Sequence, residues 1–427
     1  MRFLTSRYRP VTLILSLIGV GMLLLLYYLE IGINDPMKYS PSSIGTPEYI
    51  HTQSLEMPDS LVLQSTSDIT KQQEKVFAER RALYEEKCQQ GFKGGVWQVF
   101  YYQPAKLAVC HVQKVGCTFW KRIFHFLYGD TNGKNISSPF EIERYYVHSG
   151  GVKKTKTSSY AAKKALFDSF NKVLFVRDPW ARIWSVYIDK FVLPDSWLDY
   201  GRAIANRRVD RSRRKSCPDD IGFVEYLDFA LNVKQDAHWK PVHQVCSPCV
   251  FRPQYLGKME TFSKDSAHVL REVGLESLVQ GHDHAHYAQD EVRMLTEYIF
   301  RVFEARPPLR KCLTHAGVAE RLWMAFVLNG YIGDAQTFPK EEFTKAIDGM
   351  VNTRAASQKV VELMLKYHAN STARTSQQMK DYRRSVMVQH YRQAPRPLLE
   401  KIVKMYNGDF VLFDYEARPA DIFQPDP

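Results

Sequence analysis

Two segments with the same layout constrain the fold of this chain more than any other feature. They are residues 107–122 (LAVCHVQKVGCTFWKR) and residues 172–187 (KVLFVRDPWARIWSVY). Each opens with a short apolar run suited to a buried parallel strand, residues 107–112 and 173–176, and then turns into a helix. This layout predicts an α/β fold in which the carboxyl ends of parallel strands carry a binding site.

Both turns are suited to holding anionic groups. The first contains the residues from Lys114 to Thr118, where backbone N–H groups at a helix N-terminus bind a phosphate-like anion. In the second, Arg177 ends the strand and Asp178-Pro179 caps and starts the next helix. Ser185 follows on that helix, placed to reach back over its first turns. Together the two turns predict a site for a nucleotide that carries phosphates at two places.

The usual phosphate-binding loop, G-x-x-x-x-G-K-[ST], is absent, because here the lysine precedes the glycine. This order argues against ATP or GTP. The chain instead resembles sulfotransferases that use 3′-phosphoadenosine 5′-phosphosulfate (PAPS), and more narrowly the Golgi carbohydrate sulfotransferases of the chondroitin 4-O and HNK-1 group. Five blocks carry the resemblance: residues 114–122 (KVGCTFWKR), 175–191 (FVRDPWARIWSVYIDKF), 238–249 (HWKPVHQVCSPC), 255–261 (YLGKMET) and 409–415 (DFVLFDY).

The resemblance implies a P-loop-like sulfotransferase fold, with a central parallel sheet flanked by helices. It also implies PAPS as the donor and no metal. The residues it assigns to the donor are Lys114, Val115, Gly116, Cys117, Thr118, Phe119 and Trp120 in the 5′-phosphosulfate turn, with Arg177 and Ser185 for the 3′-phosphate. Because Arg182, Ser185 and Asp189 share a helical face, Asp189 is also a candidate internal partner for Arg182.

Sulfuryl transfer is an in-line displacement that needs charge on the leaving oxygen and a base for the acceptor hydroxyl. Lys114 is placed for the first task. In similar sulfotransferases the base lies between the two phosphate-binding segments, an interval that holds His125 and His148. We take His148 as the base, because a glycine pair follows it and lets the backbone approach a ligand; an ordinary loop histidine without a catalytic role is the alternative interpretation of His148. His125 is expected to be packed; His111 or an acidic residue is the alternative.

The amino-terminal part has the pattern of a membrane anchor. Arg2, Arg7 and Arg9 precede an apolar run long enough to cross a bilayer. A cleaved signal peptide is the competing interpretation, but the run is too long and no A-x-A-like cleavage site follows. We expect a single-pass type II Golgi membrane protein with a lumenal catalytic domain.

The expected domains are a cytoplasmic tail (1–10), a transmembrane signal anchor (11–33), a lumenal stem (34–95), a catalytic domain (96–416) and a carboxyl-terminal tail (417–427). A short helix is expected in the stem at 72–86. A helical insertion at about 280–395 is predicted as an inserted subdomain near the acceptor. After it we expect a helix at 397–406, ended by Gly408, and a strand at 410–413.

Asn135 and Asn370 begin glycosylation sequons that suit a lumenal domain. Seven cysteines permit disulfides and leave one unpaired. Cys246 and Cys249 resemble a C-x-x-C motif, but without a second such pair we favour a structural disulfide role over zinc. Cys110 and Cys117 are predicted to be buried thiols.

The net charge of +12 is partly local, because basic residues crowd the stretch from 202 to 215. We predict that this surface attracts a polyanionic glycan acceptor, such as a glycosaminoglycan or a glycoprotein glycan. The assigned residues are Arg207, Arg208, Arg211, Arg213 and Arg214. A merely solvated loop is the alternative. Nucleic acid fits the charge, but no recognisable nucleic-acid module occurs and a lumenal location opposes it.

The sequence therefore predicts a carbohydrate sulfotransferase. A glycosyltransferase would normally show an acidic D-x-D metal site, and no such triplet occurs. The other alternative is a catalytically inactive lumenal glycan-binding protein that keeps the nucleotide fold. The presence of both Lys114 and Arg177 argues against loss of the donor site.

Overall fold

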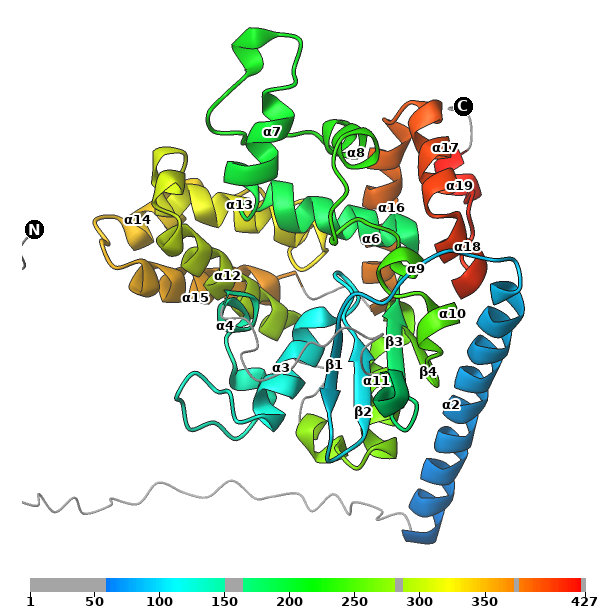
Figure 1. Ribbon diagram of the computed structural model, residues 1–427. Coiled ribbons are helices and arrows are strands. Elements are labelled where there is room, and N and C mark those ends of the chain that lie inside the picture. The colour runs from blue at the N-terminus through cyan, green and yellow to red at the C-terminus, as the bar shows by residue number, and fades with distance from the viewer. Residues whose placement is uncertain (1–58, 150–163, 281–286, 372–375, 424–427) are drawn as a thin grey trace, which may run out of the picture. The chain divides into compact units, whose positions relative to one another are not determined.

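The computed structural model describes residues 59–149, 164–280, 287–371 and 376–423 (Figure 1). These residues belong to one compact unit that starts at Asp59. The expected cytoplasmic tail, membrane anchor and first part of the stem lie outside the described residues. Among the described helices, none is both long and apolar enough to cross a membrane.

A four-stranded sheet lies at the centre of the lower half in Figure 1. Its strands, in spatial order, are β1 (Val99–Tyr102), β2 (Leu107–Cys110), β3 (Asn171–Val176) and β4 (Tyr255–Lys258). The strands β2, β3 and β4 are parallel, as predicted, but β1 is antiparallel to β2. The sheet is therefore mixed, because the turn from Gln103 to Lys106 is too short for the crossover that a parallel pair needs.

Helices cover this sheet and share its core. The helix α3 (Cys117–Leu127) follows β2 and buries Trp120, Ile123 and Phe124. The Trp120 ring lies 5.6 Å from that of Phe175 on β3. The neighbouring helical segments are α4 (Arg144–Ser149), α5 (Lys164–Phe167), α9 (Val242–Val245), α10 (Pro248–Phe251) and α11 (Phe262–Glu272).

Although Leu412 and Phe413 at the end of the last but one helix belong to the cluster of the sheet, most of the remaining helices form a second hydrophobic cluster. Its elements are α6 (Pro179–Tyr187), α7 (Arg202–Ala205), α8 (Phe223–Asn232), α12 (Tyr287–Ala305), α13 (His315–Leu328), α14 (Lys340–Ile347), α15 (Thr353–Ala369), α16 (Ser376–Arg392), α17 (Arg396–Met405), α18 (Asn407–Phe413) and α19 (Ala420–Phe423). Because α6 starts directly after β3, the strand end that carries Arg177 lies where the sheet core meets the helical core.

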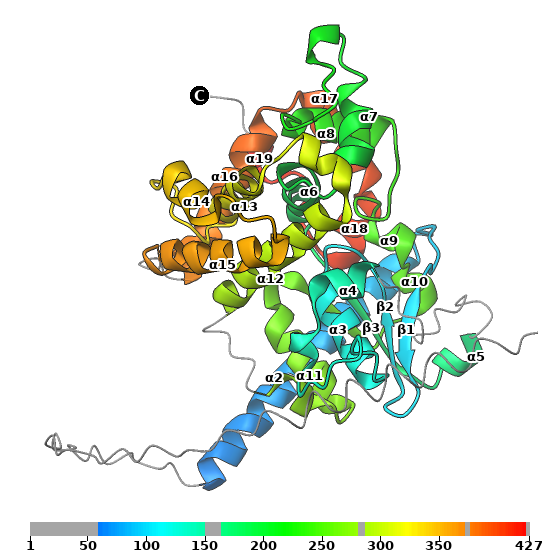
Figure 2. The same ribbon diagram turned by 90° about the vertical axis from the view of Figure 1, so that its left-hand side faces the viewer.

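The expected helical insertion is helical, but it does not form a separate subdomain. Val292, Phe326 and Val360 from this stretch share one buried cluster with Trp180 on α6 and Tyr226 on α8. Figure 2 shows α12 to α15 stacked beside α6 and α8. The amphipathic patterns identified the helices correctly, but they could not show that their apolar faces pack against α6 and its neighbours.

The predicted strand at 410–413 is wrong, because this segment belongs to helix α18. Gly408 does not end the preceding helix, which stops at Met405. Instead, it lies so close to His243 that a Cβ atom would come within 2.7 Å of the ring. The Asp409 carboxylate accepts hydrogen bonds from the backbone N–H groups of Val242 and His243. These contacts fix the segment as a helix although its composition favours a strand.

The predicted stem extended to residue 95, but its carboxyl-terminal part is packed into the compact unit. Helix α2 (Asp59–Cys88) runs alongside β4, α10 and α11 (Figure 1). Phe77 and Tyr84 are buried, and Arg80 forms a 2.7 Å ion pair with Asp265, whose carboxylate is inaccessible to solvent. The folded part of the chain therefore begins well before residue 96.

Three disulfides join distant parts of the described chain: Cys88–Cys249, Cys110–Cys246 and Cys217–Cys312. The interpretation of Cys246 and Cys249 as disulfide cysteines is confirmed, although they do not bond to each other. The prediction that Cys110 is a thiol is wrong, because it is bonded to Cys246. The isolated bridge between Val96 and Cys246 holds Cys246 just before the start of β1, where Val99 pairs with Cys110. Cys117 is free, as predicted, and half-buried.

Candidate active site

The turn after β2 has the backbone expected of an anion cradle. Lys114 and Gly116 both have positive φ angles, 67° and 83°. A side chain at Gly116 would also collide with Phe262, 2.3 Å from a built Cβ atom, so glycine is required there. No side chain caps the first turn of α3. The helix N-terminus therefore keeps its backbone N–H groups and its dipole directed at whatever binds the turn.

Arg182 links this turn to another loop of the protein. The side chain is fully buried and donates hydrogen bonds to three backbone carbonyls, those of Gln113, Lys240 and Ala237. The expected pairing of Arg182 with Asp189 is therefore wrong. A guanidinium with five donors can satisfy several carbonyls at once, and it fixes the residue preceding Lys114 to the loop before α9.

Lys114 lies in a buried network of charges. Its Nζ is 3.1 Å from Oδ2 of Asp189, whose Oδ1 accepts a 2.8 Å hydrogen bond from Arg144. Lys190 bridges Asp189 and Asp195. Burial lowers the pKa of Lys114, and the Asp189 carboxylate opposes that shift. Burial alone would raise the pKa of the Asp189 carboxyl, but the Lys114, Arg144 and Lys190 cations hold it well below its usual range.

His148 lies at the same turn. Its Nε2 is 2.9 Å from the Thr118 hydroxyl, although thirty positions separate the two residues. The ring retains an exposed face, and desolvation on its other side, followed by the positive charges of Lys121 and Arg144, lowers its pKa well below the usual value. His148 is consequently neutral at pH 7 and able to accept a proton.

The other two histidines face elsewhere. His125 is fully buried, with Nδ1 3.1 Å from Asp130 and its ring against Tyr146, so it is a packed residue as expected. His111 is buried behind the turn, where its Nδ1 lies 2.9 Å from Gln98. Burial lowers the pKa of His111 to about 3. His111 and His125 thus have partners other than Thr118, the residue that His148 contacts.

The second predicted strand end also has the expected local structure. Arg177 follows β3 and is partly exposed. Asp178 caps α6 by accepting a hydrogen bond from the Trp180 backbone N–H, and Pro179 is the first residue of the helix. Burial raises the pKa of Asp178 to about 6. Ser185 is half-buried on α6, whereas Trp180 is part of the helical core.

The fold therefore places the two predicted turns at one edge of the sheet. Both follow neighbouring parallel strands, β2 and β3, whose register is set by the pairing of Val109 with Val173. Val115 and Trp120 of the first turn are buried, and Phe119 packs against Phe262. These three residues support the turn from the core side.

The arginine cluster divides into two groups. Arg207, Arg211, Arg213 and Arg214 are exposed in the segment between α7 and α8, which protrudes from the helical part (Figures 1 and 2). Arg208 is buried and paired with Asp220 and Glu225 at 2.9 and 2.8 Å. The assignment of Arg208 to an acceptor surface is therefore wrong, because two carboxylates of the chain itself already occupy its guanidinium.

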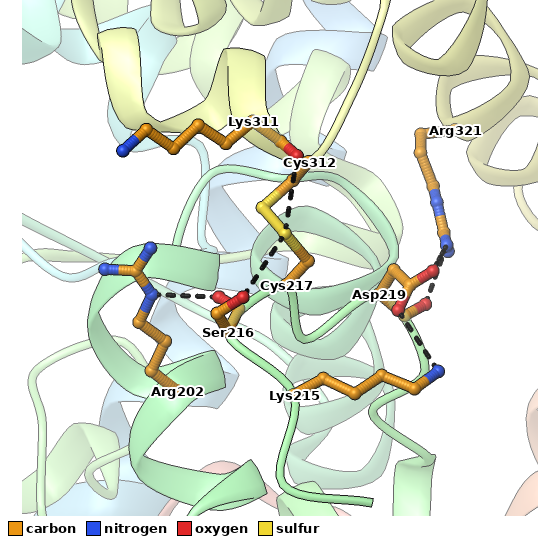
Figure 3. The surroundings of a disulfide bond; sticks show 8 residues. All are labelled: Arg202, Lys215, Ser216, Cys217, Asp219, Lys311, Cys312 and Arg321. Atoms are coloured by element: carbon orange, nitrogen blue, oxygen red, sulfur yellow. Dashed lines mark hydrogen bonds and ion pairs between the residues drawn. A yellow bond between two sulfur atoms is a disulfide. The ribbon is translucent and has the colours of Figure 1, made fainter.

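The Cys217–Cys312 disulfide fixes the base of this protruding segment to the helical part (Figure 3). Beside it, Arg202 donates to the Ser216 carbonyl, and Arg321 donates to the Asp219 carbonyl. The segment therefore presents a basic surface whose base is fixed by a disulfide and by hydrogen bonds. We name the exposed set Arg207, Arg211, Arg213 and Arg214 the basic hairpin.

The sequence reasoning missed several charged residues around Lys114. They are Arg144, Lys190 and Glu291, with the neutral Tyr298 beside them and the pairing of Asp189. Tyr298 on α12 packs against the Arg144 guanidinium at 4.6 Å, and Glu291 lies two turns earlier on the same helix face. Burial raises the pKa of Glu291. The one available signal was the polar Asp189-Lys190 pair at the end of an otherwise apolar helix.

Comparisons with known proteins agree with this site. Residues 97–310 match the model of the sulfotransferase family, and the chain belongs to that family. It is 30% identical to human carbohydrate sulfotransferase 9 over 42% of this chain and 41% of the relative. It is 31% identical to mouse carbohydrate sulfotransferase 8 (41% and 43%) and 30% identical to rat carbohydrate sulfotransferase 11 (45% and 57%). The match thus spans about half the length of these relatives. No solved structure matches the chain.

Proposed function

We propose that this protein is a carbohydrate sulfotransferase that transfers the sulfuryl group of PAPS to a sugar hydroxyl of a glycosaminoglycan or a glycoprotein glycan. The observation that carries the proposal is the joining of two anion-binding turns, at Lys114 and Arg177, on neighbouring parallel strands, with His148 beside Thr118. The relatives named as carbohydrate sulfotransferases support the acceptor class.

The residues present fit an anionic donor with two phosphate groups. The positive-φ turn and the uncapped start of α3 suit the 5′-phosphosulfate, and Arg177 with Ser185 suits the 3′-phosphate. In this assignment the Thr118 hydroxyl and the backbone N–H groups of the turn hold the phosphosulfate. The donor supplies the sulfuryl group and carries away the leaving phosphate oxygen.

Two side chains then perform the chemistry. The Lys114 ammonium stabilises the negative charge that develops on the leaving oxygen, which accelerates the reaction because the contact strengthens in the transition state. His148, neutral at pH 7, accepts the proton of the attacking hydroxyl as its oxygen bonds to sulfur. The basic hairpin attracts the polyanionic acceptor.

Labelled-sulfate transfer tests the function directly. The full-length protein is incubated with ³⁵S-labelled PAPS and a panel of desulfated glycosaminoglycans and N-glycans. We expect transfer to at least one acceptor, and none with the Lys114→Ala variant. Binding of the nucleotide without transfer to any acceptor would instead support the inactive glycan-binding alternative.

We further propose that the catalytic unit lies in the Golgi lumen, held by an anchor at residues 11–33. The support is the arginine-flanked apolar run, the exposed Asn135 and Asn370 of the two sequons, and the disulfides, which form in oxidising compartments. Protease treatment of intact microsomes tests this topology. Digestion of the catalytic unit in the absence of detergent would contradict it.

A further inference from the structure

Asp189 is the meeting point of three cations from three elements. It lies in the π-helical turn Ile188–Val192 (η3), directly after α6. Its carboxylate oxygens are 3.1 Å from Lys114 Nζ, 2.8 Å from Arg144 Nη2 and 3.7 Å from Lys190 Nζ. The side chains of Asp189, Lys114 and Arg144 are only 10%, 16% and 12% exposed. The pairing is therefore largely desolvated.

Asp189 is the carboxylate that pairs with both Lys114 and Arg144. The other carboxylate of the network, Asp195, pairs with Lys190 and accepts from the Tyr298 hydroxyl. Removing the negative charge of Asp189 would leave Lys114 facing Arg144 in a site with little water. A nearby positive charge that no carboxylate offsets disfavours the protonated form of a lysine.

The groups that surround the pair come from every element packed against it. They are Cys117 and Lys121 on α3, Arg144 and His148 on α4, Lys190 and Asp195 in and after η3, and Glu291 and Tyr298 on α12. The cations Arg144 and Lys190 both lower the pKa of Lys114, whereas Asp189 is the carboxylate that raises it. Asp189 is the carboxylate that touches its ammonium within hydrogen-bond distance.

We propose that Asp189 is a positioning residue, the counter-ion that keeps the Lys114 ammonium protonated and held at the turn after β2 until the donor's leaving oxygen takes its place. The inference rests on the proposed function. A neutral lysine could not stabilise the leaving oxygen. When Lys114 turns to the donor, Arg144 and Lys190 still neutralise Asp189, so the exchange leaves no carboxylate unpaired.

The pKa of Lys114 can be measured without any turnover. Acetic anhydride acylates only the neutral amine, so the pH dependence of Lys114 acetylation, followed by peptide mass spectrometry on the full-length protein, gives its pKa. We expect Asp189→Asn to lower that pKa by about one unit or more. Asp189→Glu should restore most of it, and Asp236→Asn, which removes a carboxylate bonded to Tyr200 and His238, should leave it unchanged.

The double variant Asp189→Asn/Lys190→Met guards against misfolding, because it keeps the net charge of the network constant. Its Lys114 pKa should again lie about one unit below that of Lys190→Met alone. If transfer activity is present, the alkaline limb of the kcat profile should shift to lower pH by the same amount. An unchanged Lys114 pKa in the Asn variants would overturn the proposal. Absence of transfer by the wild-type protein, with the Lys114 pKa still shifted in the variants, would overturn the proposed function instead.

Discussion

At the scale of single residues, sequence patterns predicted the backbone geometry of the turn after β2 but not the partners of its charged side chains. Lys114, Gly116 and Thr118 have the turn geometry that their order predicted. His148 was chosen for a nearby glycine pair, and the structure brings its ring to Thr118. Asp189 was assigned to the wrong partner. The assignment assumed that the α-helix continues through Asp189, but this residue lies in a π-helical turn and its side chain pairs with Lys114.

His148→Ala should reduce kcat by about a hundredfold or more while nucleotide affinity is retained. The base acts in its neutral form, and desolvation with nearby cations lowers its pKa. The acid limb of the wild-type kcat profile should therefore lie below the ordinary histidine pKa, so that activity persists as pH falls through 6. A pH–rate series with saturating acceptor measures this.

His238→Ala is the matched control, because that ring is bonded to Asp236 and not to Thr118. It should leave kcat near the wild-type value. Near-normal turnover in His148→Ala would move the role of base to another residue, with Glu291 the next to be substituted.

Lys114→Ala and Arg177→Ala should both abolish transfer, by different routes. Loss of the charged partner of a desolvated phosphate costs about 2–5 kcal/mol, so Arg177→Ala should mainly weaken binding of the 3′-phosphorylated nucleotide. Lys114→Ala should mainly slow chemistry, because its contact strengthens in the transition state. Calorimetry with 3′-phosphoadenosine 5′-phosphate separates the two. Equal affinity in wild type and Arg177→Ala would refute the assignment of Arg177.

At the scale of elements, the basic segment shows how one cluster in sequence becomes two in space. Arg208 points inward to Asp220 and Glu225, while its neighbours remain on the surface. Charge density along the chain predicts attraction of a polyanion. It does not say which arginine the carboxylates of the next helix will bind.

Neutralising Arg207, Arg211, Arg213 and Arg214 together should raise the acceptor KM several-fold at low salt and flatten its salt dependence, because screening weakens surface attraction. The nucleotide KM should not change. An unchanged acceptor KM would leave the basic hairpin a solvated surface.

Arg208→Ala, in contrast, should lower stability by about 1–3 kcal/mol. Arg208 is buried, but its partners Asp220 and Glu225 are 33% and 30% exposed, so water can hydrate these carboxylates once the guanidinium is removed. Thermal unfolding distinguishes the two sets of arginines. A wild-type melting temperature in Arg208→Ala would show that its ion pairs contribute little.

At the scale of the whole molecule, the folded unit is larger than the family-matching region, residues 97–310. Helix α2 precedes it and α13 to α19 follow it, and both parts bury apolar side chains against the site-bearing elements. The turns are thus held by a body that includes the presumed stem and insertion.

A fragment that starts at residue 59 should fold stably, whereas one that starts at residue 92 should not. The shorter fragment loses Phe77, Tyr84, the Arg80–Asp265 pair and the Cys88–Cys249 disulfide. Loss of a native disulfide alone typically costs about 2–5 kcal/mol. Secretion yield and thermal unfolding measure the difference, with Cys88→Ala/Cys249→Ala in the longer fragment isolating the disulfide. Equal stability of the two fragments would show that α2 is only a spacer.

The sequence by itself determined the features that depend on neighbours along the chain. These are the apolar runs of β2 and β3, the glycine in the anion turn, the Asp-Pro start of α6 and the amphipathic helices after residue 287. Each rests on local periodicity or on a backbone angle that few residues accept. That is why the two strand ends and the turns that follow them could be predicted from the sequence.

Only the tertiary structure decided the features that depend on distant neighbours. Cys110 is bonded to Cys246, residues 410–413 are helical because Asp409 binds the start of α9, and Lys114 is paired with Asp189. Pairings of this kind form between segments separated by up to hundreds of residues, and no local pattern encodes which groups will meet. Burial then fixes their charge states, because removing water makes every ion and hydrogen bond depend on the partner that packing supplies.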